Sequence, residues 1–215
     1  MSATTVEPAR ASGQSRPPTV APEVGVLVME NDAWLRSRVC QLLETEPSLR
    51  LAWVAETAEE AQWMAEHEPV DVAVVGHRPR SLSGLWVCRE LKRAASPPGV
   101  VICSVYPDAV LTACCVVAEA DALVSMYDCD AELSAVLRRV GLGARFLPTV
   151  PPRLGAMLHE LLQPAENAMF SLLLAGIPAT DVAAALRMSD AEFESRRSAL
   201  LGKLEALPPV GGMRY

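Results

Sequence analysis

Five short apolar runs, each followed by a stretch of helical periodicity, constrain the fold of this chain more than any other feature. The runs cover residues 24–29, 49–56, 70–76, 99–106 and 120–125, and the helical stretches cover 32–46, 58–68, 84–94, 109–120 and 130–141. Strict alternation of strands and helices indicates right-handed βαβ units and hence an α/β fold. The runs at 70–76 and 99–106 are almost continuously apolar, which is typical of parallel strands covered on both faces.

Proline and glycine positions divide the chain into segments. Residues 1–22 are rich in Ser, Thr, Pro and Ala without an apolar period, which predicts a disordered tail. The α/β pattern predicts a domain over 23–146, and Pro148, Pro151 and Pro152 mark a linker with a short helix over 147–161. The helix of the linker is expected at about 153–161. Residues 162–207 are expected to form an all-helical segment, with helices at about 165–175, 179–186 and 190–206, and residues 208–215 are expected to form a tail.

Composition and charge exclude several classes of protein. The chain has 19 basic against 26 acidic side chains, a formal net charge of −7, which argues against a strongly basic nucleic-acid binder. No apolar run is long enough to cross a bilayer and the start lacks the apolar stretch of a signal peptide, so we expect a cytoplasmic protein without a membrane partner. The six cysteines form no C-x-x-C pair, which predicts reduced core thiols rather than disulfides or a metal site: Cys40, Cys88, Cys103, Cys114, Cys115 and Cys129.

A second pattern lies at the ends of the predicted strands. Glu30 and Asn31 follow the first strand, Gly76 ends the third, Ser104 lies at the end of the fourth and Met126 follows the fifth. With the order of elements, these anchor positions resemble the receiver domain of bacterial response regulators of the NarL/FixJ family, over roughly residues 24–145. The resemblance implies a doubly wound, five-stranded parallel sheet with the flavodoxin-like strand order.

The same resemblance implies that the phosphorylation chemistry has been lost. A receiver uses an acidic pair for Mg²⁺, an Asp that accepts phosphate, a Ser or Thr, and a Lys. Here Asn31 replaces one acid, Gly76 replaces the acceptor and Met126 replaces the Lys, while Ser104 keeps the hydroxyl. Glycine has no nucleophile, and one carboxylate plus one amide is a poor Mg²⁺ site. We therefore expect no phosphorylation, no metal and no cofactor at this degenerate pocket.

Two questions about this domain stay open from the sequence. His77, beside Gly76, is either a substitute acceptor or, as we favour, an ordinary exposed loop imidazole. The degenerate pocket either has no ligand, in a domain that only dimerises, or binds a small molecule or a partner peptide. Surplus apolar residues on two predicted helices, Val116, Val117, Val136 and Leu137, favour a homodimer through this domain, although they could also be core.

The helical segment carries its own markers. Gln163 and Pro164 lie where a helix begins, with Glu166 in its first turn, and Gly176 lies where that helix ends. Ser189 precedes the last helix and Glu192 follows three residues later, as in a capping box. In register with the apolar positions, these residues resemble a LuxR-type helix-turn-helix. The resemblance implies DNA binding through the last helix, the recognition helix.

The charges of this segment are unfavourable for DNA. Residues 162–207 hold four basic side chains against six acidic ones, the wrong sign for phosphate attraction. The candidate DNA-contacting residues are Thr180, Ser189, Glu194, Ser195, Arg196, Arg197, Ser198 and Lys203. Glu194 either accepts from a cytosine amino group or is a solvated acid. Arg197 falls where the family has an apolar residue, so it either extends outward or pairs with Glu166.

Two functions follow from these features, and neither is enzymatic. The first is an atypical, phosphorylation-independent transcriptional regulator that binds DNA, as a dimer, through its helix-turn-helix. The alternative is a protein-interaction adaptor of the same ancestry that has lost DNA binding. The fold markers and the C-terminal arginines favour the first, and the acidic recognition helix favours the second.

Overall fold

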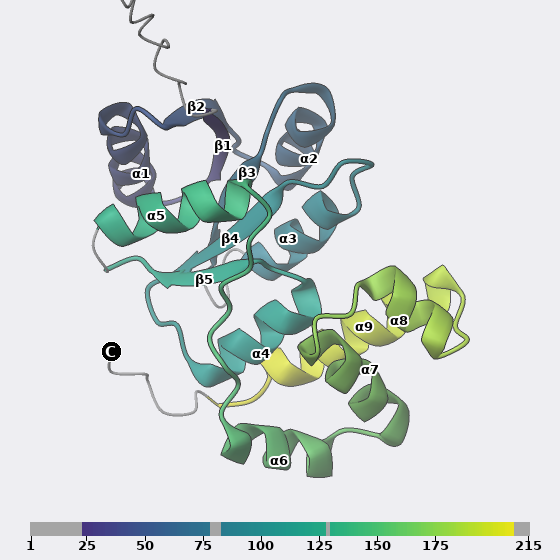
Figure 1. Cartoon of the computed structure of the whole chain (residues 1–215). Helices are drawn as coiled ribbons and strands as arrows, with labels where there is room; N and C mark the ends of the chain where they lie inside the picture. Colours follow the sequence, from purple (N-terminus) through teal and green to yellow (C-terminus); the bar gives the residue numbers. More distant parts are fainter. Residues whose placement is uncertain (1–22, 78–82, 128–129, 209–215) are drawn as a thin grey trace, which may run out of the picture.

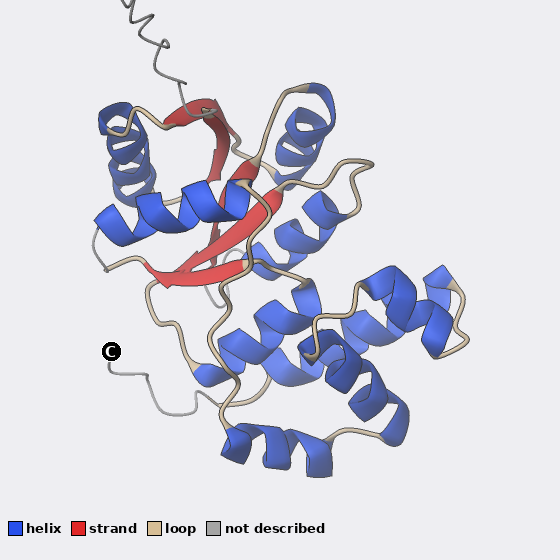
Figure 2. Cartoon of the chain, in the orientation of Figure 1, coloured by secondary structure: helices blue, strands red, loops and turns tan. Residues whose placement is uncertain are grey.

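The α/β part of the chain is built on one parallel sheet (Figures 1 and 2). The computed structural model describes residues 23–77, 83–127 and 130–208. The strands are β1 (Val24–Met29), β2 (Leu49–Val54), β3 (Val72–His77), β4 (Gly99–Ser104) and β5 (Ala122–Ser125). They are ordered β2-β1-β3-β4-β5, and every pair is parallel. The expected doubly wound sheet and its strand order are confirmed.

Helices cover both faces of this sheet (Figure 1). On one face, α1 (Ala33–Thr45) and α5 (Asp130–Gly141) pack on Val26, Val28 and Val74. On the other face, α2 (Ala58–His67), α3 (Gly84–Lys92) and α4 (Ala109–Ala118) pack on the side chains that alternate with these along the strands, such as Leu27 and Val75. Burial on both faces explains why the central strands are continuously apolar.

The C-terminal segment consists of α6 (Pro152–Leu161), α7 (Pro164–Leu174), α8 (Ala179–Ala185) and α9 (Asp190–Glu205). The N–H of Gln163 donates to the Glu166 carboxylate at 2.8 Å where α7 begins, and Gly176, at φ +79°, ends this helix as the sequence predicts. The hydroxyl of Ser189 accepts from the N–H of Glu192 at 3.3 Å and caps α9. The Glu192 carboxylate does not complete a capping box, because it pairs with Arg196.

The two parts of the chain pack together along α4 (Figure 1). All ten residues of α4 are buried, because the sheet covers one side of the helix and α7 and α9 cover the other. One hydrophobic cluster therefore extends from the strands through α4 to Phe170 and Leu200. Val116 and Val117, whose apolar character had favoured a dimer, are buried within the same chain, and Leu137 is core.

Some expectations fall where the structure describes little or nothing. The tails predicted at 1–22 and 208–215 lie outside the described residues, apart from Pro208, and so does Cys129. In the part of the chain that is described, no helix is both long and apolar enough to span a membrane.

Candidate functional site

The position that corresponds to the phosphate acceptor of a receiver domain is filled by a neighbouring side chain. Gly76 lies near the carboxyl end of β3, and Glu30 follows β1, its neighbour in the sheet. Glu30 is 2 % exposed, and a Cβ atom built on Gly76 would lie 2.7 Å from the carboxyl carbon of Glu30. This separation is well below van der Waals contact. The Glu30 carboxylate therefore takes the space into which an acceptor side chain at position 76 would project.

The backbone after β1 holds Glu30 in this position. The N–H of Asp32 donates to Oε1 of Glu30 at 2.8 Å, and the guanidinium of Arg36 donates to the Glu30 carbonyl oxygen at 2.8 Å. Asp32 itself caps α1 by accepting from the N–H groups of Trp34 and Leu35, as expected for a helix N-cap. Local hydrogen bonds therefore direct the Glu30 side chain into the sheet end.

The other residues of the degenerate pocket do not assemble a phosphate or Mg²⁺ site. Asn31 is exposed, whereas Ser104 is buried and its hydroxyl accepts from the N–H of Tyr106 at 3.3 Å. Met126 is buried and packs with the core on the α1 and α5 face. Among the residues that the structure describes, no group of three His, Cys, Asp or Glu side chains could hold a metal ion. The residues present do not fit Mg²⁺, because the Glu30 carboxylate fills the space that the phosphoryl chemistry requires.

His77 is not the exposed loop residue that we favoured from the sequence. It is the last residue of β3, is 7 % exposed, and pairs with Ser104 in the sheet register. Burial lowers the pKa of its imidazole, an effect that Asp108 opposes. The imidazole is therefore buried, and its lowered pKa favours the uncharged form. Its Nδ1 has no hydrogen-bond partner within the described parts of the chain.

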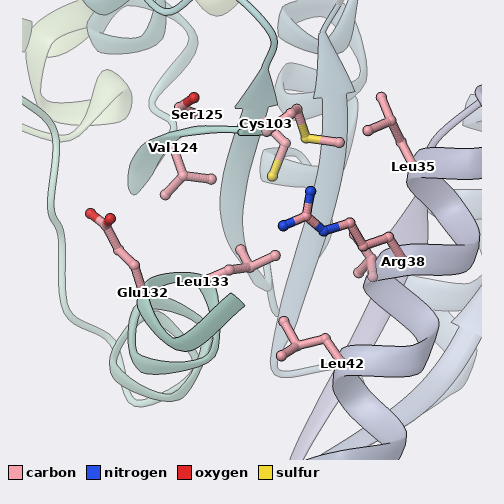
Figure 3. A pocket seen from close by; sticks show the side chains of 10 residues that line it. Leu35, Arg38, Leu42, Cys103, Val124, Ser125, Glu132 and Leu133 are labelled. Atoms are coloured by element: carbon pink, nitrogen blue, oxygen red, sulfur yellow. The ribbon is translucent and has the colours of Figure 1, made fainter. Parts of the chain in front are cut away.

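A small cavity lies between α1 and α5, beside the ends of β4 and β5 (Figure 3). Its walls are mostly apolar and include Met126, Cys103, Leu35 and Leu133. The guanidinium of Arg38 points into it from α1, as Figure 3 shows. The Lys-to-Met replacement therefore contributes an apolar wall where a receiver has a cation.

The four buried thiols behave as core residues. Cys88, Cys103, Cys114 and Cys115 are free and at most 1 % exposed. Burial raises the pKa of each, to about 12 for Cys88. The expectation that these four cysteines are core residues is confirmed.

The helix-turn-helix comprises α8 and α9, joined by a turn in which Arg187 has φ +54°. One side of α9 is buried through Phe193, Leu200, Leu201 and Leu204. The other half is exposed and consists of Asp190, Ala191, Glu192, Ser195, Arg196, Ser198, Ala199, Gly202 and Glu205. Of the candidate DNA residues, Thr180, Ser189, Ser195, Arg196 and Ser198 are exposed, although Ser189 is engaged as a cap.

Every basic side chain of α9 is held in an ion pair within the chain. Arg196 pairs with Glu192 at 2.8 Å, and Lys203 pairs with Glu166 at 2.5 Å. Both positions expected for Arg197 are wrong, because it neither extends outward nor pairs with Glu166. Arg197 is 4 % exposed, and its Nε donates to the carbonyl oxygen of Val117, near the end of α4, at 2.6 Å.

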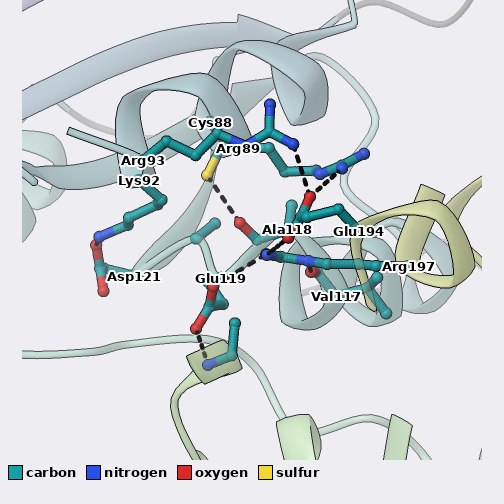
Figure 4. A network of polar contacts seen from close by, with 12 residues as sticks. Cys88, Arg89, Lys92, Arg93, Val117, Ala118, Glu119, Asp121, Glu194 and Arg197 are labelled. Carbon is teal, nitrogen blue, oxygen red and sulfur yellow. Dashed lines mark hydrogen bonds and ion pairs between the residues drawn. The ribbon is translucent and has the colours of Figure 1, made fainter. Parts of the chain in front are cut away.

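Arg197 belongs to an interdomain ion-pair network, which consists of Arg89, Arg93, Glu119, Glu194 and Arg197 (Figure 4). Glu119, at the end of α4, pairs with Arg197 at 3.0 Å and accepts from the N–H of Ala179 in α8 at 2.9 Å. Glu194 pairs with Arg89 of α3 at 2.5 Å, with Arg93, which follows α3, at 2.7 Å, and with Arg197 at 3.2 Å. Glu194 is therefore neither a free surface acid nor available to a base.

The sequence analysis missed the α3 and α4 members of this network. Arg89 lies among Leu85, Cys88 and Leu91 on the buried part of α3, so its charge needs a partner from elsewhere in the chain. Glu119 adopts a left-handed backbone conformation, with φ +60°, at the end of α4. An arginine within a buried helix face was the available signal, but nothing local identified Glu194 as its partner.

Comparisons with known proteins agree with this fold. The complex of the two-component response regulator RcsB with DNA matches with a TM-score of 0.54 at 15% identity, over 86% of this chain and 94% of that chain. A LuxR-family two-component response regulator from Aurantimonas matches with a TM-score of 0.53 at 16% identity, over 65% and 97%. The receiver domain of a putative NarL regulator from Mycobacterium tuberculosis matches with a TM-score of 0.52 at 19% identity, over 57% and 98%. No protein-family model and no curated protein matches the sequence. The chain has the fold of LuxR-type response regulators, a receiver-like domain followed by a helical domain.

Proposed function

We propose that this chain is a phosphorylation-independent transcriptional regulator of the NarL/FixJ type that binds DNA through α8 and α9. The observation that carries this proposal is the intact helix-turn-helix, in which Ser189 caps α9 and half of that helix is exposed. A helix presented in this way fits the major groove. The match to a regulator solved in complex with DNA supports the same reading. The chain is a regulator rather than an enzyme.

Independence from phosphate follows from the Glu30 and Gly76 arrangement. A glycine cannot form an acyl phosphate, and the neighbouring carboxylate both repels a phosphoryl anion and takes its space. The receiver-like domain therefore acts as a scaffold for the helix-turn-helix. A small molecule or partner peptide that entered near Arg38 and Met126, beside the degenerate pocket, would replace phosphate as the signal.

In this proposal, only a few exposed side chains of α8 and α9 contact DNA. The hydroxyls of Ser195, Ser198 and Thr180 are exposed and can donate to phosphates or base edges. Arg196 and its partner Glu192 are both exposed. Because a surface ion pair contributes little free energy, a DNA phosphate can replace Glu192 as the partner of Arg196 at small cost. Arg187 is exposed in the turn before α9. Binding should therefore be weak and strongly salt-dependent.

A second function has its own support. Arg197 and Lys203 are engaged with Glu119 and Glu166, and this leaves α9 with an exposed face of small, uncharged residues and three carboxylates, those of Asp190, Glu192 and Glu205. Such a face suits a protein partner, as in the adaptor alternative.

Dimerisation remains a prediction. Of the four apolar residues that favoured it, Val116 and Val117 on α4 and Leu137 on α5 are buried within the chain, and only Val136 on α5 is partly exposed.

A fluorescence titration against a pool of labelled genomic fragments tests the proposal. Wild type and Arg196→Ala are titrated at two salt concentrations, with Arg153→Ala, which removes an exposed arginine from α6, as the matched control. We expect Arg196→Ala to weaken binding to all sequences and to flatten the salt dependence by about one unit of slope, while the control leaves both unchanged. Absence of binding at low salt, for wild type and variants alike, would leave the adaptor as the better account.

A further inference from the structure

Two exposed tryptophans lie on one surface at the β2 edge of the sheet. Trp53 lies on β2, the edge strand, and Trp63 lies on α2, the helix that follows it. They are 45 % and 53 % exposed. The indole N–H of Trp53 donates to Oε1 of Glu60 at 2.9 Å, and Glu60 lies three residues before Trp63, on the same side of α2. The two rings are therefore neighbours, at the end of the molecule opposite α6 (Figure 1).

Both rings are held in position by contacts within the chain. The other oxygen of Glu60 accepts from the N–H of Glu56 at 3.0 Å, and these hydrogen bonds from Glu56 and Trp53 lower the pKa of Glu60. The carboxylate that orients Trp53 is thus charged at neutral pH. The Trp63 ring stacks on His67 with 4.3 Å between ring centroids, and Nδ1 of His67 lies 2.8 Å from the Trp63 carbonyl oxygen. Rings fixed in this way lose little conformational entropy when a partner covers them.

The surroundings of the two rings are acidic. Residues 51–77 include no Lys or Arg and six carboxylates, those of Glu56, Glu59, Glu60, Glu66, Glu68 and Asp71. Glu59 and Glu66 are exposed and flank Trp63 along α2. Arg50, earlier on β2, pairs with Glu23 at 3.7 Å. We name the resulting group the tryptophan surface, which consists of Trp53, Glu59, Glu60, Trp63, Glu66 and His67.

We propose that the tryptophan surface binds an extended, arginine-bearing segment of a partner protein. A guanidinium stacks on an indole face and pairs with a carboxylate at its rim, and the tryptophan surface offers both groups side by side. Within the described residues β2 pairs only with β1, so its outer backbone groups are available to an added strand. Alternate side chains of such a strand point to the same side, which brings arginines at alternate positions over the tryptophan surface.

The charge of the tryptophan surface favours this partner over a second copy of the chain. Two copies that met through this surface would bring like charges together, which is unfavourable. A cationic segment instead neutralises the carboxylates that flank Trp63. The inference does not involve α9, and it holds whether or not the chain binds DNA.

The test is a fluorescence anisotropy titration of the full chain against a labelled peptide in which Arg alternates with Thr. The same peptide with Lys in place of Arg carries equal charge without the planar guanidinium. Trp63→Gln removes one ring from an exposed helix position, and Glu59→Gln combined with Glu66→Gln removes two flanking charges. Trp86→Gln is the matched control, because Trp86 is 45 % exposed but lies on α3, outside the tryptophan surface. Circular dichroism checks that each variant folds.

We expect wild type and the control to bind the arginine peptide equally, and Trp63→Gln to bind it about tenfold more weakly. The double glutamine variant should bind more weakly and with a smaller salt dependence, and the lysine peptide should bind wild type several-fold more weakly than the arginine peptide. No binding of the arginine peptide to wild type, or equal binding by wild type and Trp63→Gln, overturns the proposal. Equal affinity for the two peptides also overturns it, because charge alone would then explain binding. Light scattering that shows a wild-type dimer and a monomeric Trp63→Gln overturns it in favour of a second copy.

Discussion

The carboxylate of Glu30 and the bare α-carbon of Gly76 occupy complementary space at the ends of β1 and β3. A Cβ on residue 76 would lie 2.7 Å from the carboxyl carbon of Glu30. A side chain at position 76 therefore requires the Glu30 carboxylate, the far end of a flexible side chain, to move. The two positions have to be considered together in any attempt to rebuild a receiver site here.

Gly76→Ala should destabilise the fold by about 1 kcal/mol, the low end of the cost of overpacking a core, because the Glu30 side chain can move aside if it gives up the hydrogen bond from the N–H of Asp32. In a Glu30→Ala background the same substitution should cost much less, because the carboxylate no longer opposes the methyl group. Urea unfolding of the two single variants and the double variant measures this coupling. The matched control is Gly155→Ala in α6, where an added Cβ meets nothing within 4 Å and should be neutral or stabilising. Additive effects of Gly76→Ala and Glu30→Ala would contradict the packing argument.

Acetyl phosphate should leave the protein unmodified. Incubation with Mg²⁺ followed by intact mass measurement should show no phosphoryl adduct, for wild type and for Gly76→Asp alike, because Glu30 still fills the pocket and Met126 supplies no cation. A stoichiometric adduct on wild type that disappeared on replacement of Glu30 would show that this carboxylate is itself an acceptor.

The fold could be predicted from the sequence because each element carries its own periodicity and caps. The end of α7 at Gly176 and the α9 cap at Ser189 follow from local patterns, whereas the strand order was implied by the resemblance to receiver domains. The role of Arg197 could not, because its partners Val117 and Glu119 lie far from it in the chain. The alignment of Gly76 with the phosphate acceptor of a receiver domain predicted that the acceptor carboxylate is missing. That the Glu30 side chain fills the space is visible only in three dimensions.

Native thiol reactivity should be low. Burial raises the pKa values of Cys88, Cys103, Cys114 and Cys115, so these thiols remain protonated and inaccessible at pH 8. A thiol-reactive chromophore should label these four residues only after denaturation, with peptide mapping to identify them. Rapid labelling of Cys114 or Cys115 in the native state would mean that α4 is exposed in solution and that the domains separate readily.

The interdomain ion-pair network should be insensitive to pH near neutrality and should weaken in acid. Burial acts to raise the pKa of the Glu194 carboxyl, but the hydrogen bond from Arg89 and the charges of Arg197 and Arg89 outweigh it, so the pKa is lowered. A carboxyl with a lowered folded-state pKa stabilises the fold above its unfolded pKa of about 4.3, and this contribution is lost as the pH falls further. The melting temperatures of wild type and of Arg89→Met with Arg93→Met should therefore differ by a constant amount from about pH 6 to 8 and converge in acid. A difference that vanished already at pH 6 would exclude Glu194 as the titrating group.

Glu194→Lys and Ser195→Lys separate the two ways in which a lysine on α9 can increase DNA binding. Both variants add positive charge to the same helix, but Ser195 is exposed and outside the network, whereas Glu194 holds Arg89 and Arg93. Ser195→Lys should strengthen non-specific binding and steepen the salt dependence by about one unit, without changing the radius of gyration. Glu194→Lys changes the charge by two units and places a fourth cation beside Arg89, Arg93 and Arg197, so it should also separate the domains and give a larger gain than its charge alone predicts. The measurement is a titration at two salt concentrations with scattering on the same samples. Gains in proportion to the added charge, with unchanged scattering, would mean that charge alone governs access to α9 and that the network has no control over it.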